Sequence, residues 1–375
     1  MDILARARKL EAQGRSIIHM EIGEPDFPTP EPIIEAGIQS LKQNKTHYTA
    51  STGLPELRTA ISGDYAHRFG VEVDAEQIII TPGASGALQT LLAYLNGGGN
   101  RLMIGDPTYP CNRTLTQVYH GECLMVPVEI EDHYQLSLAR VQEYWDDRIN
   151  AVLIASPANP TGTLCDTCEL LAIADYLQQH SACLIVDEIY QGLVYDHENQ
   201  TVAGLRDNIF VINSFSKYFG MMGWRLGWLV CPQNHYAALD AMAQNTYLAP
   251  STPAQYAAYA AFDERCFEIY EQRKREFQKR RDFLIEKLSQ IGCEFPVIPQ
   301  GAFYLYVDVS RWCRNSFEFC QDLLEKTGVA ITPGCDFGYY RANQHVRLAY
   351  TTGIDQLQEA CVRLATYMDE LAPLV

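Results

Sequence analysis

Short apolar runs alternate with longer amphipathic stretches through the first two-thirds of the chain. Near-continuous apolar runs predict strands buried on both faces, and these runs lie at 78–80, 101–104, 152–155, 183–186 and 209–212. A further run at 228–230 predicts a strand whose direction could be antiparallel. Because the stretches between the runs read as helices, we expect an α/β domain with a mostly parallel sheet covered by helices.

The pattern changes near residue 253. Long helices are predicted from there to residue 292, and the charged stretch 268–289 has no helix breaker, so one helix could pass between two domains. The rest predicts strands at 302–309, 329–331 and 345–350, with helices at 316–327 and 354–371. We expect a smaller α+β domain that the N-terminal segment joins through a helix at 3–14 and a strand at 17–22. The predicted division is an N-terminal segment 1–30, a large domain 31–270 and a small domain 271–375.

Composition and charge exclude several classes of protein. The chain has 375 residues, 47% of them hydrophobic and 20% charged, which is ordinary for a globular protein of about two domains. Its net charge of -17 argues against nucleic acid or an anionic membrane as the main partner. No apolar run reaches the roughly 18 residues of a membrane span, and residues 1–18 lack the apolar core of a signal peptide.

The twelve cysteines, without such a signal, favour the reducing cytoplasm. Cys165 and Cys168 have the spacing of a metal-binding or redox pair, but neither a second such pair nor a histidine cluster accompanies them. We therefore predict no metal site.

The stretch 213–227, directly after the strand at 209–212, carries chemistry that is unusual for a core segment. Its lysine, Lys217, would lose its proton more easily in a dry pocket, and a neutral amine can form a Schiff base. The hydroxyls of Ser214 and Ser216 and the guanidinium of Arg225 suit a phosphate. An amine for an aldehyde beside groups for a phosphate indicates pyridoxal phosphate (PLP). Taken alone, the stretch also fits a surface lysine and arginine on a glycine-rich loop.

Polar and aromatic side chains follow the other predicted strands at their carboxyl ends, where open α/β sheets bind ligands. Asp187 could hold the ring nitrogen of PLP, whereas the adjacent Glu188 would have to point away from the site. The remaining partners would be Asn159 and Tyr190 for the ring oxygen, Tyr109 for the ring face, and Ala84, Ser85 and Gly86 of the turn 81–86 for the phosphate.

Eight short motifs occur in one order along nearly the whole chain. They are Gly-Glu-Pro-Asp-Phe at 23–27, Tyr-Thr…Gly…Pro-Glu-Leu-Arg at 48–58, Thr-Pro-Gly-Ala-Ser-Gly at 81–86, Asn-Pro-Thr-Gly at 159–162, Asp-Glu-Ile-Tyr at 187–190, Ser-Phe-Ser-Lys at 214–217, Gly-Trp-Arg-Leu-Gly at 223–227 and Arg-Leu-Ala-Tyr at 347–350. In these motifs the chain resembles the class I/II, aspartate aminotransferase-like, PLP-dependent aminotransferases of fold type I.

The resemblance implies a role for each matching residue. Lys217 would carry the internal aldimine and then move protons. Asp187 would pair with the ring nitrogen, Asn159 and Tyr190 would flank the ring oxygen, and Tyr109 would stack on the ring. The resemblance also implies a phosphate site made by Ser85, Ser214, Ser216 and Arg225.

The resemblance further implies how substrate and partner are bound. Arg347 would grip the substrate α-carboxylate, helped by Asn159 and the backbone of Ile22 and Gly23. Tyr48 would reach the phosphate of the neighbouring subunit, which makes the active unit a homodimer. We identify no second arginine for a dicarboxylate substrate, and the sequence leaves the amino donor open.

The expected reaction is a ping-pong transfer of an amino group between an L-amino acid and a 2-keto acid through a Lys217 aldimine. A PLP-dependent carbon–sulfur β-lyase of the same fold is the alternative, because it would use every one of these cofactor residues. A regulatory protein built on this fold is disfavoured, because the sequence offers no room for a DNA-binding domain before Gly23.

Overall fold

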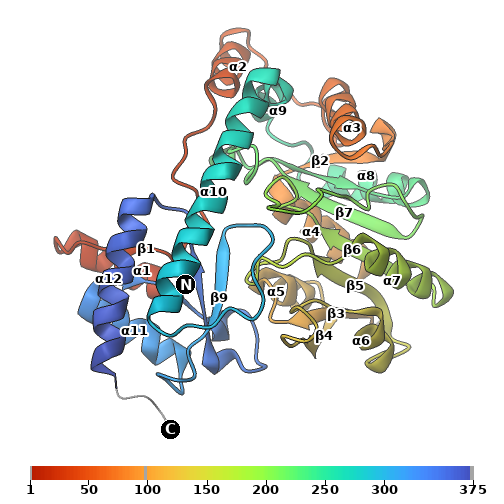
Figure 1. The fold of residues 1–375 in the computed structure, drawn as a ribbon. Helices are drawn as coiled ribbons and strands as arrows, with labels where there is room; N and C mark the ends of the chain where they lie inside the picture. The colour runs from red at the N-terminus through yellow and green to blue at the C-terminus, as the bar shows by residue number, and fades with distance from the viewer. Residues whose placement is uncertain (1, 97–98, 372–375) are drawn as a thin grey trace.

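The computed structural model describes residues 2–96 and 99–371, and its centre is a seven-stranded sheet (Figure 1). In spatial order the strands are β2 (Ile78–Thr81), β8 (Gly227–Val230), β7 (Ile209–Ser214), β6 (Cys183–Asp187), β5 (Ile149–Ala155), β3 (Arg101–Asp106) and β4 (Glu122–Pro127). β8 runs antiparallel to both of its neighbours, and the other pairings are parallel. This confirms the predicted mostly parallel α/β sheet and the antiparallel strand at 228–230.

Helices cover both faces of this sheet, as expected for strands that carry apolar side chains on both faces. Successive strand residues belong to two separate apolar clusters: Leu153 of β5 lies in one cluster, and its neighbours Val152 and Ile154 lie in the other. The cluster with Leu153 includes α4 (Gly83–Leu95), α5 (Pro110–Val118) and α8 (Gln233–Thr246). The cluster on the opposite face includes α3 (Pro55–Phe69), α6 (Leu138–Glu143) and α7 (Thr167–Gln179).

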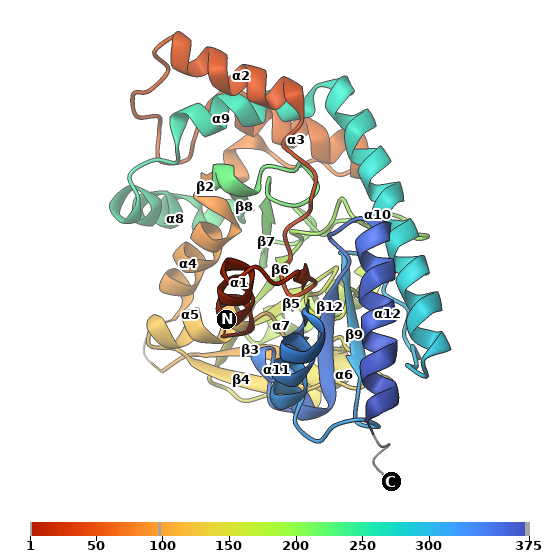
Figure 2. The same ribbon diagram turned by 90° about the vertical axis from the view of Figure 1, so that its left-hand side faces the viewer.

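A second group of elements brings the two ends of the chain together. β11 (Thr332–Pro333), β12 (His345–Ala349) and β9 (Tyr304–Asp308) form an antiparallel sheet. β1 (Ile18–His19) pairs in parallel with β10 (Val329–Ala330). Around these strands lie α1 (Asp2–Ala12), α11 (Ser316–Thr327) and α12 (Ile354–Glu370), as Figure 2 shows. The N-terminal segment thus pairs with the C-terminal part of the chain.

The long helix α10 (Glu264–Gln290) contains the whole charged stretch 268–289. It runs from the region of α9 (Thr252–Tyr259), which packs on α2 (Glu31–Lys42), to the region of α12 (Figures 1 and 2). Its buried Arg280 donates two hydrogen bonds to the carboxylate of Asp26, at 2.9 and 3.2 Å. The rings of Phe27 and Phe277 meet edge to face at 5.4 Å. These contacts fix the proline-rich loop after β1 to the helix.

Two local predictions differ from the structure. Helix α4 begins at Gly83, so Ala84, Ser85 and Gly86 form its first turn rather than a turn before it. The chain can enter the helix this early because Gly83 has a φ of 72°, which glycine adopts without strain. The edge strand β4 was missed because it begins at the exposed Glu122 and ends at Pro127, so it lacks the continuous apolar run of the inner strands.

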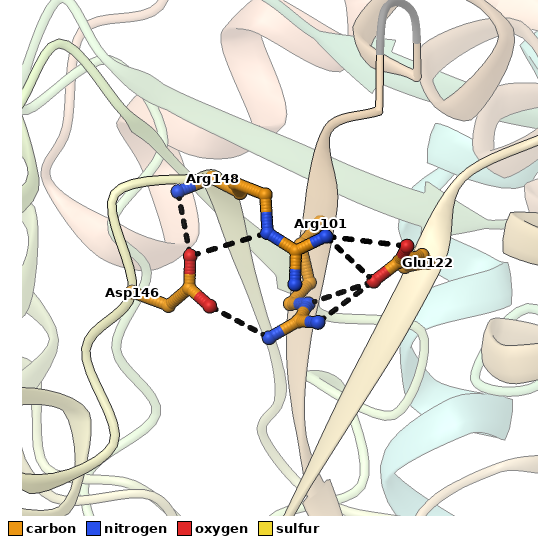
Figure 3. A network of polar contacts seen from close by, with 4 residues as sticks. All are labelled: Arg101, Glu122, Asp146 and Arg148. Atoms are coloured by element: carbon orange, nitrogen blue, oxygen red, sulfur yellow. Dashed lines mark hydrogen bonds and ion pairs between the residues drawn. The ribbon is translucent and has the colours of Figure 1, made fainter.

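Charged residues cluster at the amino ends of three adjacent strands (Figure 3). Arg101, at the start of β3, lies 2.7 Å from Glu122 of β4 and 2.8 Å from Asp146, which precedes β5. Arg148 contacts the same two carboxylates. The cluster is partly exposed and therefore adds little stability, but it joins the three amino ends. The polar side chains predicted to form the site gather at the other ends of these strands, the carboxyl ends.

Among the described residues, no helix has both the length and the apolar character that crossing a membrane requires.

Candidate active site

A cavity of about 600 Å³ lies at the carboxyl ends of the central strands, next to the small antiparallel sheet. Twelve of the fourteen predicted site residues line it: Gly23, Ala84, Ser85, Tyr109, Asn159, Asp187, Tyr190, Ser214, Ser216, Lys217, Arg225 and Arg347. Of the other two, Gly86 faces Pro82 in the first turn of α4. Tyr48 lies on the loop between α2 and α3, with 83% of its surface exposed.

Lys217 follows β7 and reaches into this cavity. Its Nζ donates a hydrogen bond to the backbone carbonyl of Gly23 at 2.8 Å. Burial, together with the nearby guanidinium groups of Arg347 and Arg225, lowers the pKa of Lys217 to about 8. A much larger share of this amine is therefore neutral near pH 7 than of an ordinary lysine, and a neutral amine can attack a carbonyl carbon.

Asp187 is the last residue of β6, and the side chain of the next residue, Glu188, points to the opposite side. Asp187 lines the cavity, where burial raises the pKa of its carboxyl to about 6. Glu188 accepts hydrogen bonds from Thr201 Oγ1 at 2.7 Å and from the Val202 N–H at 3.1 Å, away from the cavity. A cationic group beside Asp187 would favour its ionised form.

The groups predicted to hold a phosphate meet at the amino end of α4. The hydroxyls of Ser214 and Ser216 are 2.9 Å apart, and the guanidinium of Arg225 lies against Gly83, where a Cβ atom would come within 2.8 Å of it. In the described part of the chain, Arg225 donates to the Met222 carbonyl at 3.0 Å and forms no ion pair with a carboxylate. A helix amino end, two hydroxyls and an uncompensated guanidinium fit a phosphate.

Arg347, on β12, is buried at the other side of the cavity. It donates to Asn159 Oδ1 at 2.9 Å and to the Glu21 carbonyl at 2.6 Å. Ile22 and Gly23, whose backbone we expect to help bind the substrate carboxylate, line the same cavity. The Arg347 guanidinium also lies 4.3 Å from the centre of the Tyr304 ring. Its Nε has no hydrogen-bond partner among the described residues, so a bound carboxylate would complete its donors.

Tyr304 is a cavity residue that our sequence analysis missed. Its hydroxyl lies 2.8 Å from the hydroxyl of Tyr190, and a Cβ atom on Gly23 would come within 1.9 Å of the same oxygen. Position 23 must therefore be glycine while Tyr304 keeps this place. Tyr304 stands in the apolar run that begins β9, and nothing in that pattern separates it from an ordinary core residue.

We expect Tyr304→Phe to lower the free energy of unfolding by about 1 kcal/mol, because the buried Tyr190 hydroxyl loses this partner. Urea unfolding followed by circular dichroism would measure the change. The matched control is Tyr339→Phe, at a side chain that is 72% exposed, and it should leave the stability unchanged. Equal stabilities of the two variants would contradict the importance of this hydrogen bond.

Fold and site together define a PLP-type aminotransferase, and comparison with known proteins shows the family. The family model for aminotransferase class I and II matches residues 15–364, so the chain belongs to this family. Enzymes of this family use PLP. The chain is an enzyme that acts as a transaminase, and the relatives described below are aminotransferases.

Individual relatives are similar over almost their whole length. A valine–pyruvate aminotransferase of Mycobacterium tuberculosis is 35% identical over 98% of this chain and 95% of its own. An aspartate aminotransferase of Geobacillus stearothermophilus is 33% identical over 99% of this chain and 96% of its own. A crystal structure of an aminotransferase from Mycobacterium tuberculosis superposes with a TM-score of 0.94, at 34% identity, over 98% of this chain and 96% of that one.

Proposed function

We propose that this transaminase binds PLP in the cavity described above and attaches it to Lys217. The observation that carries the proposal is the meeting of the half-buried amine of Lys217, the half-buried carboxylate of Asp187 and a set of phosphate-binding groups in one cavity. Bound PLP would supply an aldehyde that captures the substrate amine and a ring that withdraws electrons from the substrate Cα. The phosphate would lie at Ser85, Ser214, Ser216 and Arg225.

The residues of the strand ends would orient the ring. Asp187 would keep the ring nitrogen protonated. Burial disfavours the charged form of the Asp187 carboxylate, and the positive charge of the protonated nitrogen would offset that cost. Asn159 and Tyr190 would donate or accept at the ring oxygen, and Tyr109, at the start of α5, would cover the ring face. Tyr304 would hold the Tyr190 hydroxyl in place through their hydrogen bond.

Arg347 would bind the α-carboxylate of the substrate. Asn159 and Glu21 hold its guanidinium, so the arginine fork is fixed before the substrate arrives. Lys217, displaced by the substrate amine, would take the proton from the substrate Cα and return it to the cofactor carbon. Its lowered pKa suits both halves of this proton transfer.

The rest of the cavity favours a substrate with an uncharged side chain. Apolar residues contribute to its wall, among them Ile3 and Leu4 of α1, Leu115 of α5 and Phe337. Among the described residues that line the cavity, the arginines and lysines are Lys217, Arg225 and Arg347, and each already has a role. We therefore propose an aliphatic amino acid as donor and a 2-keto acid as acceptor. The similarity to a valine–pyruvate aminotransferase supports this choice.

An absorption spectrum of the purified protein tests the proposal. We expect a visible band that valine bleaches and that pyruvate restores. Aspartate should bleach it less efficiently. A band that persists while pyruvate and ammonia accumulate from cystathionine would instead indicate the β-lyase. A protein that shows no band after PLP has been added would contradict the proposed cofactor.

The reaction of the cofactor-free protein with PLP should depend on pH in a defined direction. Only the neutral amine reacts, and the pKa of Lys217 is lowered to about 8, so the rate should rise about tenfold per pH unit below pH 8 and level off above it. Stopped-flow absorbance would record this rate. A rate that keeps rising to pH 10, as for a free lysine side chain with a pKa of about 10.4, would contradict the effect of burial.

Three further points belong to the proposal. We propose a homodimer in which Tyr48 reaches the phosphate site of the neighbouring subunit, which its exposure on the α2–α3 loop supports.

We keep the predicted division of the chain into domains at residues 30 and 270, with α10 crossing the second boundary. We also propose a cytoplasmic location, since every one of the twelve cysteines is unpaired.

A further inference from the structure

A second cavity, of about 490 Å³, lies on the other side of the β6 end from the active site. Glu188 lines it, whereas the preceding residue, Asp187, lines the first cavity, and no residue lines both. Its walls come from the loop after β4, the segment leading into α7, the segment 191–202 and Gln300 before β9. A cavity of this size can enclose a small organic molecule.

Carboxylates dominate the wall of this second cavity, which also contains His133 and His197. One of the carboxylates, Asp132, is paired with Arg140 at 2.9 Å. Five carboxylates line the cavity, and the lining contains no arginine or lysine; the five are Asp132, Asp166, Glu169, Glu188 and Glu198. Glu188 is 2% exposed, and its two oxygens each accept one hydrogen bond from the protein, which leaves each a further lone pair. No group of described residues has the arrangement of a metal site, so an organic cation suits this cavity better than a metal ion.

Gln191 supplies an independent sign of a ligand. Its side chain lines the same cavity, is 5% exposed and makes no hydrogen bond with any other described residue. The amide of Gln191 faces the cavity, and side-chain amides in proteins nearly always have a hydrogen-bond partner. The amide of Gln191 can donate and accept, so a polar molecule in the cavity would satisfy it.

From these features we infer that the second cavity binds a small organic diamine. One ammonium group would lie against Glu188 and donate to its carboxylate, and the other ammonium group would donate to the side-chain oxygen of Gln191. The absence of arginine and lysine from the described wall disfavours any ligand with a carboxylate, including the amino acid substrates. The site is thus separate from the active site in position and in the charge that it selects.

Isothermal titration calorimetry of the holoenzyme with 1,4-diaminobutane tests the inference. The holoenzyme is first reduced with borohydride, which fixes the cofactor on Lys217 so that the diamine cannot react with it. We expect one diamine per chain, and no binding of the neutral analogue 1,4-butanediol. Glu188→Gln and Gln191→Leu should each weaken binding at least about tenfold, since the first removes the negative charge that attracts the ammonium group and the second removes the amide that the diamine contacts.

The control is Glu72→Gln, which removes one exposed carboxylate outside the cavity and should leave the affinity unchanged. Absence of binding, or equal affinity in all three variants, would overturn the inference, because the diamine would then be drawn only to the acidic surface. Circular dichroism checks that each variant is folded. If Glu188→Gln fails to fold, Gln191→Leu against the control decides the question.

Discussion

Lys217→Ala is expected to lower the rate of transamination by at least about 10⁴-fold, the upper range for loss of a positioned acid–base group. The variant loses both the amine that captures the cofactor and the group that moves the substrate proton. Single-turnover absorbance with the amino donor would measure the effect. Added methylamine should restore part of the rate, since it can carry the proton but is not held beside Gly23.

The matched control is Lys279→Ala on the exposed side of α10, which should keep the rate of the unchanged protein. Lys217→Ala should still bind PLP without a covalent bond, because the groups around the phosphate remain. A normal rate of transamination in Lys217→Ala would contradict the role assigned to Lys217 and the proposed chemistry of the cavity.

Arg347→Lys should raise the KM for the amino donor about 100-fold and change kcat much less. Lysine keeps the charge but cannot present the fixed fork of a guanidinium, and a lost hydrogen bond between charged groups costs about 1.5–3 kcal/mol. Steady-state kinetics with the amino acid would separate the two constants. The hydrogen bonds to Asn159 and Glu21 would also be weakened, so the melting temperature must be measured beside them.

An amine of the same shape that lacks the carboxylate gives the sharper comparison. The unchanged protein should prefer the amino acid strongly, and Arg347→Lys should lose most of that preference. Arg314→Lys, at an exposed position before α11, is the control and should keep it. An unchanged KM in Arg347→Lys would show that another group binds the carboxylate.

The sequence predicted the inner strands and the residues just after them for one physical reason. Parallel strands buried on both faces are apolar throughout, so a polar residue such as Asp187 marks the strand end and the edge where ligands bind. The edge strand β4 is only partly buried, so its residues need not all be apolar and the sequence shows no continuous apolar run there. The start of α4 depended on the backbone conformation of Gly83, which composition alone does not specify.

Contacts between distant parts of the chain could not be predicted in the same way. The Glu21 carbonyl meets Arg347, and the Tyr304 hydroxyl meets Tyr190, only because the N-terminal segment and the small sheet come together beside the cavity. Backbone carbonyls carry no signature in a sequence. A tyrosine in an apolar run is equally suited to packing, so its hydroxyl partner is visible only in the structure.

The helix α10 is linked by side-chain contacts to the loop that lines the cavity. It has 27 residues and so is about 40 Å long, and its Arg280 and Phe277 hold Asp26 and Phe27. Three residues before Asp26 lies Gly23, whose carbonyl holds the amine of Lys217. Any displacement of α10 would therefore act, through Arg280 and Asp26, on the backbone that holds the amine of Lys217.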